Sequence, residues 1–169
     1  NGAAYDSEIF SSFGADYFRA VEGELESWAE SPRGRLALII LLDQFSRHIH
    51  RGSAEQFSQD LKAQQLCLDG IGVGDDQNLH PVERVFFYLP LEHAEDIERQ
   101  NLSLQAYAGL INDVPESHRP YFEETYKWAD MHHYVIEQFG RFPELNEMLG
   151  RESTEEELAF LAEGKYSFL

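Results

Sequence analysis

The sequence predicts an all-α protein. No segment alternates between apolar and polar residues with period two over enough positions to indicate a strand. Apolar residues recur instead at helical spacing, and the boundaries between these stretches carry N-cap residues, prolines and glycines. Because long helical stretches are joined by short connections, we expect antiparallel helical hairpins, about eight helices in all.

The first predicted helix follows Asp6, which we expect to be its cap, and ends near Gly23. Its apolar residues are spaced three and four apart, as one face of a helix requires. This face consists of Ile9, Phe10, Phe13, Tyr17, Phe18 and Val21.

Residues 31–51 form the segment around which we expect the other helices to pack. Ser31 is a good N-cap and Pro32 a good first helical residue, and seven consecutive apolar residues follow at positions 36–42. A helix that is apolar on every side must be surrounded by other helices. The run is too short to cross a bilayer, for which about 20 apolar residues are needed. It therefore predicts a helix buried in the core of the protein, with a polar segment after it.

The middle of the chain predicts a helix, a loop and a second, shorter helix. Ser53 and Gln56 have the spacing of a capping box, and the helix they would open ends at Gly70. Residues 71–80 are rich in glycine, aspartate and asparagine, which is typical of a loop. Pro81 then begins a short helix that Pro90 ends.

Four helices are predicted from residue 102 onward, one of them a single turn that Phe142-Pro143 opens. Two of them cover residues 102–111 and 121–138. Thr154 and Glu157 have the spacing of a second capping box, which predicts that the last helix begins after Thr154.

Composition limits both the architecture and the partners. The length of 169 residues and a hydrophobic content of 43% predict one domain spanning residues 1–169. The net charge of −18 opposes binding to nucleic acid or to a membrane surface, so we expect neither partner. The single cysteine, Cys67, lies on an apolar helix face and predicts a buried, inert thiol, which fits a cytoplasmic protein.

Arginines near the buried helix and near the end of the chain are the first candidates for a site. Asp43 and Arg47 lie four apart, so on a helix they meet on one face and can form an ion pair at the edge of the core. This pair is either a structural clamp or part of a pocket. In the second case Arg51, Arg141 and Arg151 would add guanidinium forks for a carboxylate or phosphate.

Histidines and carboxylates form the second set of candidates, for acid-base chemistry or metal binding. The set is His93, Glu95, Asp96, His132 and His133. His132 and His133 point about 100° apart on a helix, so at most one of them faces a common site. No dedicated ligand motif is present, so we expect structural histidines, no metal and no cofactor.

Four stretches together resemble one bacterial family, the domain of unknown function numbered 924. They are LALIILLDQFSRHIHRG at 36–52, FFYLPLEHAEDIERQ at 86–100, HHYVIEQFGRFP at 132–143 and LGRESTEEELAFL at 149–161. The resemblance implies an all-α, tetratricopeptide-like fold and favours His132 over its neighbour. It also implies that the chain lacks a tryptophan- and phenylalanine-rich helix with which the family usually begins.

The chain departs from the family pattern at three places. Glu144 and Leu145 stand where the family has a His-Arg pair, residues 46–48 read Ser-Arg-His where it has Pro-Arg-Asn, and Ala94 replaces a serine. A basic pair and a hydroxyl of the family pattern are therefore absent here.

Two functional interpretations follow, and the sequence leaves both open. The preferred one is a helical binding domain with a polar pocket for a small anionic ligand or a peptide terminus. The pocket would be lined by Asp43, Gln44, Arg47, Arg51, His93, Glu95, His132, Arg141 and Arg151. The alternative is a small-molecule hydrolase in which His93 or His132 is the general base and arginines stabilise the transition state.

Overall fold

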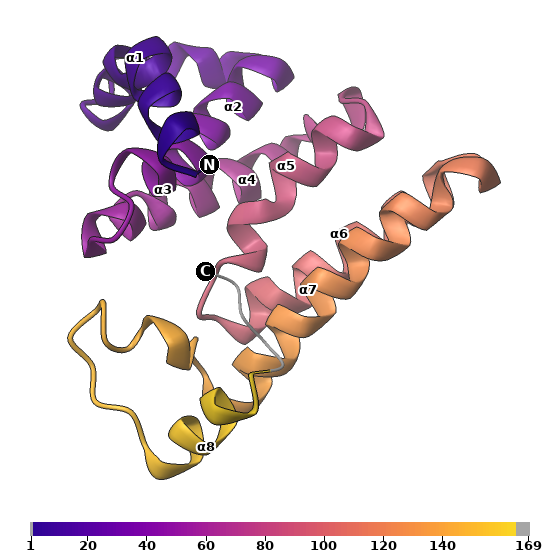
Figure 1. Ribbon diagram of the computed structural model, residues 1–169. Helices are drawn as coiled ribbons and strands as arrows, with labels where there is room; N and C mark the ends of the chain where they lie inside the picture. Colours follow the sequence, from indigo (N-terminus) through magenta and orange to yellow (C-terminus); the bar gives the residue numbers. More distant parts are fainter. Residues whose placement is uncertain (1, 165–169) are drawn as a thin grey trace. The chain divides into compact units, whose positions relative to one another are not determined.

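The structure is a computed structural model in which residues 2–164 are described, with side chains from residue 4 onward. It confirms the all-α prediction: the described residues contain eight α-helices, α1 to α8, one π-helical turn and short 3-10 turns, and none of these residues is in a strand (Figure 1). The chain divides into two compact units, Asn1–Leu91 (unit 1) and Glu92–Leu169 (unit 2). The expectations of one domain and of a tetratricopeptide-like arrangement stay predictions.

Unit 1 contains the first five helices. They are α1 (Gly2–Val21), α2 (Pro32–Ile39), α3 (Ser46–Ile49), α4 (Asp60–Val73) and α5 (Pro81–Glu92), whose last residue begins unit 2. A π-helical turn, η2 (Ile40–Phe45), joins α2 to α3 without a break. Three 3-10 turns complete the unit: η1 (Glu26–Glu30), η3 (Ala54–Phe57) and η4 (Asp76–Asn78).

The predicted buried helix is confirmed. The Ser31 hydroxyl accepts a hydrogen bond from the Gly34 N–H at 3.2 Å, and Pro32 is the first helical residue. The helix is enclosed by α1 and α4, which contribute Tyr17 and Ala63 to the core. Its own buried apolar side chains are Leu36, Leu38, Ile39, Leu41 and Leu42. The π-helical turn was not predicted, because apolar periodicity does not distinguish i→i+5 from i→i+4 hydrogen bonding over one turn.

The start and end predicted for the fourth helix were wrong. The Ser53 side chain makes no capping hydrogen bond. Its hydroxyl donates to the Glu55 carboxylate at 2.6 Å, and α4 begins only at Asp60. The helix continues through Gly70 to Val73, so the loop predicted over residues 71–80 starts later and includes η4. Gly70 is needed for packing rather than as a stop, because a Cβ there would collide with the Phe87 ring.

Pro90 does not end α5, which continues two residues further to Glu92. A proline lacks the N–H that would bond to the carbonyl four residues earlier, and it clashes most in a helix interior. In α5 the bond to the carbonyl of Phe86 is therefore missing, but the helical backbone continues past it. Burial of Leu91, which is 0% exposed, favours continuing the helix past the proline.

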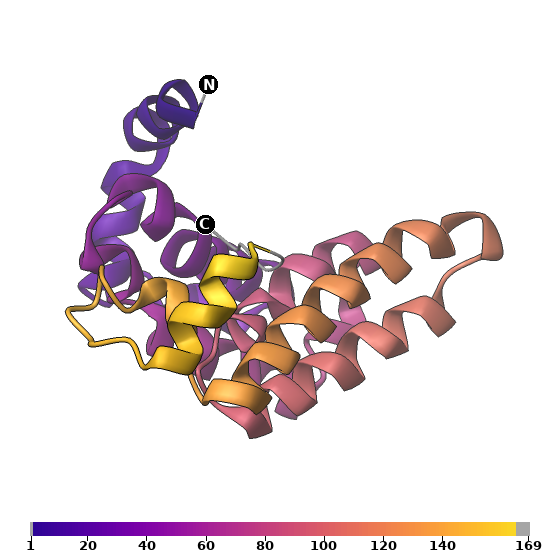
Figure 2. The same ribbon diagram turned by 60° about the horizontal axis from the view of Figure 1, so that its bottom comes forward.

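Unit 2 is organised around one helical hairpin. Helices α6 (Ile97–Asp113) and α7 (Arg119–Phe139) lie side by side and antiparallel, joined by the 3-10 turn η5 (Glu116–His118), as Figures 1 and 2 show. This confirms the predicted antiparallel pairing. A turn η6 (Pro143–Leu145) and helix α8 (Glu155–Glu163) follow. A small core of Val135, Ile136 and Phe142, with Phe139, Leu145 and Phe160 against it, joins these last elements to α7.

The capping box at the start of α8 is confirmed. The Thr154 hydroxyl accepts from the Glu157 N–H at 3.2 Å, and the Glu157 carboxylate accepts from the Thr154 N–H at 2.7 Å.

Thr154→Ala removes the first of these bonds, so we expect a loss of about 1 kcal/mol in the free energy of unfolding. Urea denaturation measures it, with Ser11→Ala inside α1 as a control that should change stability by only a few tenths of a kcal/mol. Equal midpoints for Thr154→Ala and the parent would contradict the cap.

None of the helices in the described part of the chain combines the length and the hydropathy that crossing a membrane requires.

Candidate functional site

The residues predicted to line one pocket belong to two units. Asp43, Gln44, Arg47 and Arg51 lie in unit 1, whereas His93, Glu95, His132, Arg141 and Arg151 lie in unit 2. Within each unit the predicted acids lie against arginines, whereas His93 and His132 lie beside each other.

Arg47 holds two carboxylates in unit 1. Its Nη1 and Nη2 donate to the two oxygens of Asp60 at 2.8 and 3.0 Å, and Nη1 lies 3.2 Å from Oδ1 of Asp43. The predicted Asp43–Arg47 pair therefore exists, and the Asp43 side chain is 1% exposed. Gln44 also donates to it, at 2.5 Å. Burial works against the Arg47 charge, but the two carboxylates outweigh it and raise the pKa of the guanidinium.

Arg51 binds an acid at the start of the chain. Its Nε and Nη2 donate to the two oxygens of Asp6 at 2.7 and 2.9 Å, and Nδ1 of His48 lies 2.7 Å from Oδ1 of Asp6. Hydrogen bonds from Arg51 and then His48 hold the pKa of the Asp6 carboxyl well below its usual range. Asp6 was predicted to cap the first helix. That prediction was wrong, because α1 begins at Gly2 and Asp6 lies inside it.

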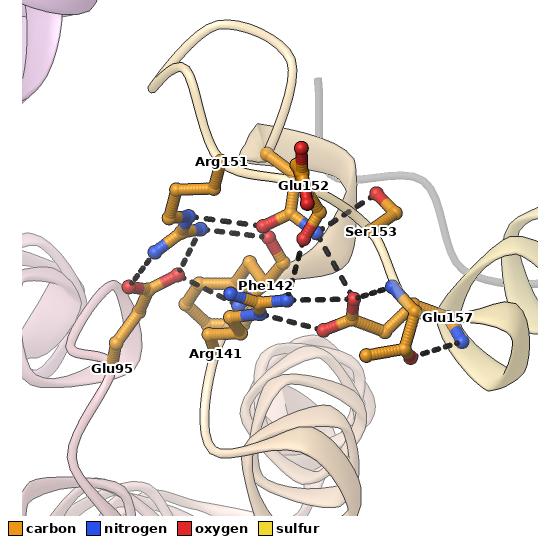
Figure 3. Close-up of polar contacts among 9 residues, drawn as sticks. Glu95, Arg141, Phe142, Arg151, Glu152, Ser153 and Glu157 are labelled. Carbon is orange, nitrogen blue, oxygen red and sulfur yellow. Dashed lines mark hydrogen bonds and ion pairs between the residues drawn. The ribbon is translucent and has the colours of Figure 1, made fainter.

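The most open of the arginine clusters in unit 2 surrounds Glu95, which lies in the connection between α5 and α6 (Figure 3). Oε2 of Glu95 accepts from Nη1 of Arg151 at 2.6 Å, and Oε1 accepts from Nη2 of Arg151 at 2.8 Å and from the Phe142 N–H at 2.7 Å. The Arg151 and Glu95 side chains are 25% and 28% exposed. We call the Arg151 guanidinium and the Phe142 N–H the Glu95 cradle.

Asn146 keeps the cradle in place. Its side-chain oxygen accepts from Nε of Arg151 at 2.9 Å, and its backbone oxygen accepts from the Arg151 N–H at 2.7 Å. The Phe142 carbonyl accepts from Nη2 of Arg151 at 3.2 Å. Asn146 is 1% exposed. Sequence reasoning missed this residue; its position after the one-turn helix that Phe142-Pro143 opens was the available signal.

Arg141 forms an ion pair with a buried carboxylate on α8. Its Nε and Nη2 donate to the two oxygens of Glu157 at 2.6 and 2.8 Å (Figure 3). Glu157 is 3% exposed and also completes the capping box with Thr154. The hydrogen bond from Arg141, followed by that from the Thr154 N–H, lowers the pKa of Glu157 to about 2. Arg141 therefore joins α8 to the end of α7.

His132 is the buried member of the histidine pair on α7, at 7% exposure. Its Nδ1 lies 2.8 Å from the Trp128 carbonyl oxygen and 3.1 Å from Oε1 of Glu92. Both partners are acceptors, so Nδ1 of His132 carries a proton that it donates to them. The His93 ring lies 6.2 Å from the His132 ring. His133 faces elsewhere, with Nε2 2.9 Å from Oδ1 of Asn101.

A buried polar network in unit 1 was missed by sequence reasoning. The Tyr88 hydroxyl donates to Asp76 at 2.6 Å and accepts from Nε of Arg84 at 3.1 Å, and all three residues are buried. Burial, followed by the bond to Asp76, raises the pKa of the phenol. No local motif connects the three residues, which come from η4 and α5.

Among residues 4–164, no group of three or more histidine, cysteine, aspartate and glutamate side chains is placed to hold a metal ion. Cys67 is 0% exposed, as predicted, and burial raises the pKa of its thiol. A buried thiol with a raised pKa is a poor nucleophile.

The chain is similar to proteins whose function is not established. The family described as bacterial protein of unknown function (DUF924) matches residues 1–165. A solved structure of a protein of unknown function from Agrobacterium tumefaciens is 37% identical, with a TM-score of 0.83, and the match covers 96% of this chain and 86% of that one. No curated protein matches. The resemblance carried by the four sequence stretches is thereby confirmed.

Proposed function

The chain belongs to the DUF924 family of bacterial proteins, and from the geometry of its polar clusters we propose that it is a helical binding domain for a small anionic ligand or a peptide terminus. One observation supports this most. Three N–H donors, two from Arg151 and one from Phe142, converge on the partly exposed carboxylate of Glu95. The chain has a net charge of −18, but this group of N–H donors carries the positive charge of Arg151 and would attract an anion.

The other predicted arginines are less suited to an external ligand. Arg47 and Arg141 hold carboxylates that are 1% and 3% exposed, Asp43 and Glu157, so we assign them a structural role. Arg51 is 54% exposed, but its partner Asp6 is shared with His48 and no backbone donor of the described residues joins that pair. Arg151 combines a fixed orientation with access to solvent, which is what bidentate recognition of an anion requires.

A thermal-shift titration tests the proposal. A ligand that binds only the folded state raises Tm by mass action, so acetate, succinate, phosphate and sulfate are added in turn at constant ionic strength. We expect at least one anion to raise the Tm of the parent, and this rise to disappear in Arg151→Met. Arg19→Met, which removes an exposed arginine in unit 1, is the matched control and should keep the rise. A parent Tm that no anion changes would remove the proposal.

A hydrolase remains the second candidate because of one observation. Glu92 and the Trp128 carbonyl both lie against Nδ1 of His132 and orient its ring, as the third group beside a general base does. The 7% exposure of His132 argues against direct access by a substrate. Hydrolysis of p-nitrophenyl acetate or p-nitrophenyl phosphate that is lost in His132→Gln, at unchanged Tm, would favour this candidate. If neither ester is hydrolysed faster than in buffer, the candidate loses its support.

A further inference from the structure

We propose that the Glu95 cradle is selective for carboxylates, and that Glu95 is an internal ligand occupying the place of an external one. This deepens the proposed function, on which it rests, because it names the chemical class of the anion and explains how the site is filled when no ligand is bound. The argument depends only on residues of unit 2.

The donors of the cradle define two oxygen positions and no more. One position receives Nη1 of Arg151 at 2.6 Å; the other receives Nη2 at 2.8 Å and the Phe142 N–H at 2.7 Å. Two oxygens of one planar group satisfy all three donors, which is the fork geometry that guanidinium and carboxylate share. The cradle is therefore complete once a single carboxylate is bound.

A tetrahedral anion would find no partner for its remaining oxygens among these atoms. The polar atoms next to the guanidinium are acceptors: Oδ1 of Asn146 takes the bond from Nε, and the Phe142 carbonyl takes one from Nη2. The nearby Arg141 is already bound through two nitrogens to Glu157. One guanidinium charge also balances one carboxylate, whereas a phosphate dianion would add an uncompensated charge to an acidic protein.

The cradle does not depend on Glu95 for its shape. The Asn146 side chain and the Phe142 carbonyl accept hydrogen bonds from two nitrogens of the Arg151 guanidinium, Nε and Nη2, and both acceptors belong to the segment around η6 rather than to the α5–α6 connection. Among the described residues, the Glu95 carboxylate makes no hydrogen bond outside the cradle. An external carboxylate that replaces it therefore recovers every bond that Arg151 and Phe142 lose.

Chemical rescue of Glu95→Ala tests the selectivity. The variant leaves the donors without an acceptor and should have a lower Tm than the parent. Formate, acetate and propionate should each raise its Tm in a dose-dependent way, whereas phosphate and sulfate at the same ionic strength should do no more than chloride. The backbone amide resonance of Phe142 in an ¹⁵N–¹H spectrum should shift on addition of acetate, which places the bound ion at the cradle.

Two matched controls test whether rescue by carboxylates occurs at the Glu95 cradle. Arg151→Met combined with Glu95→Ala should abolish rescue, because the fork is gone. Asp6→Ala also removes a carboxylate from an arginine, but it leaves Arg51 without a backbone donor beside it, so acetate should give little rescue there. If Glu95→Ala does not fold, Glu95→Asp, whose shorter side chain reaches the donors poorly, is titrated with the same anions and judged by the same outcomes.

The outcomes separate this inference from the proposed function. Rescue by carboxylates alone supports the inference even if the parent shows no shift; in that case only the proposed function fails, because Glu95 is then not displaced in the natural chain. Absence of rescue by carboxylates, or equal rescue by phosphate and sulfate, overturns the inference. A Phe142 resonance that does not respond to acetate overturns it as well.

Discussion

Arg47→Met should lower the free energy of unfolding by about 3 kcal/mol, because it leaves a buried carboxylate without its cation. Asp43 is 1% exposed, and the hydrogen bond that it accepts from Gln44 brings no positive charge to replace that of Arg47. Breaking a fully buried ion pair costs about 3 to 5 kcal/mol, and the 21% exposure of Arg47 places the expectation at the lower end. Urea denaturation followed by circular dichroism measures the change.

The double variant Arg47→Met, Asp43→Leu is the internal check. It also removes the Asp43 carboxylate, so it should recover part of the lost free energy of unfolding. The recovery should be incomplete, because Asp60 also loses its bidentate partner. Arg19→Met is the exposed control; its pair with Asp16 is about half exposed, and we expect a change within about 0.5 kcal/mol. An unchanged midpoint for Arg47→Met would contradict the structural role assigned to this arginine.

Gly34→Ala should destabilise the protein by about 3 kcal/mol, although helix propensity alone predicts a gain of about 1 kcal/mol. Gly34 lies in the first turn of α2, and a Cβ there would fall on the backbone carbonyl oxygen of Trp28. The same Cβ would lie 2.8 Å from the capping hydroxyl of Ser31. Neither the backbone oxygen nor the cap can move without disturbing the start of the buried helix. The midpoint of urea denaturation shows whether Gly34→Ala stabilises or destabilises the protein.

Gly72→Ala is the matched control for this prediction. Gly72 also lies inside a helix, α4, but a Cβ built on it meets no atom within 4 Å. The substitution should therefore stabilise the protein by up to about 1 kcal/mol, as propensity predicts. If Gly34→Ala were as stabilising as Gly72→Ala, the close approach of Trp28 to α2 would be wrong.

Fold class and several helix boundaries were readable from the sequence because their causes are local. The Ser31-Pro32 start of α2 and the Thr154–Glu157 capping box involve residues within three positions of each other. The apolar run after Ser31 can be buried only by other helices, whatever their arrangement. Boundaries were predicted wrongly where a glycine or proline served packing instead of punctuation, as Gly70 and Pro90 show.

The types of residue in the candidate site were also predictable, but their partners were not. Arginines in an acidic chain must bind carboxylates or ligands, and the sequence singled out Arg47, Arg51, Arg141 and Arg151. It identified one partner, Asp43, because that residue lies four positions before Arg47 on the same helix. Asp60 was not considered as the second partner, and Asp6 was taken as a cap rather than as an acid for Arg51.

Sequence alone determined that the protein is all-α, that most of the apolar run at residues 36–42 is buried, and that a strongly acidic chain keeps a few arginines at polar clusters. Only the tertiary structure decided that Arg47 and Arg141 neutralise buried acids whereas Arg151 holds the partly exposed Glu95, 56 positions earlier in the chain. The reason is physical. Helix formation depends on interactions within about one turn, whereas the partner of a charge depends on which segments the packing of the core brings within about 3 Å of it.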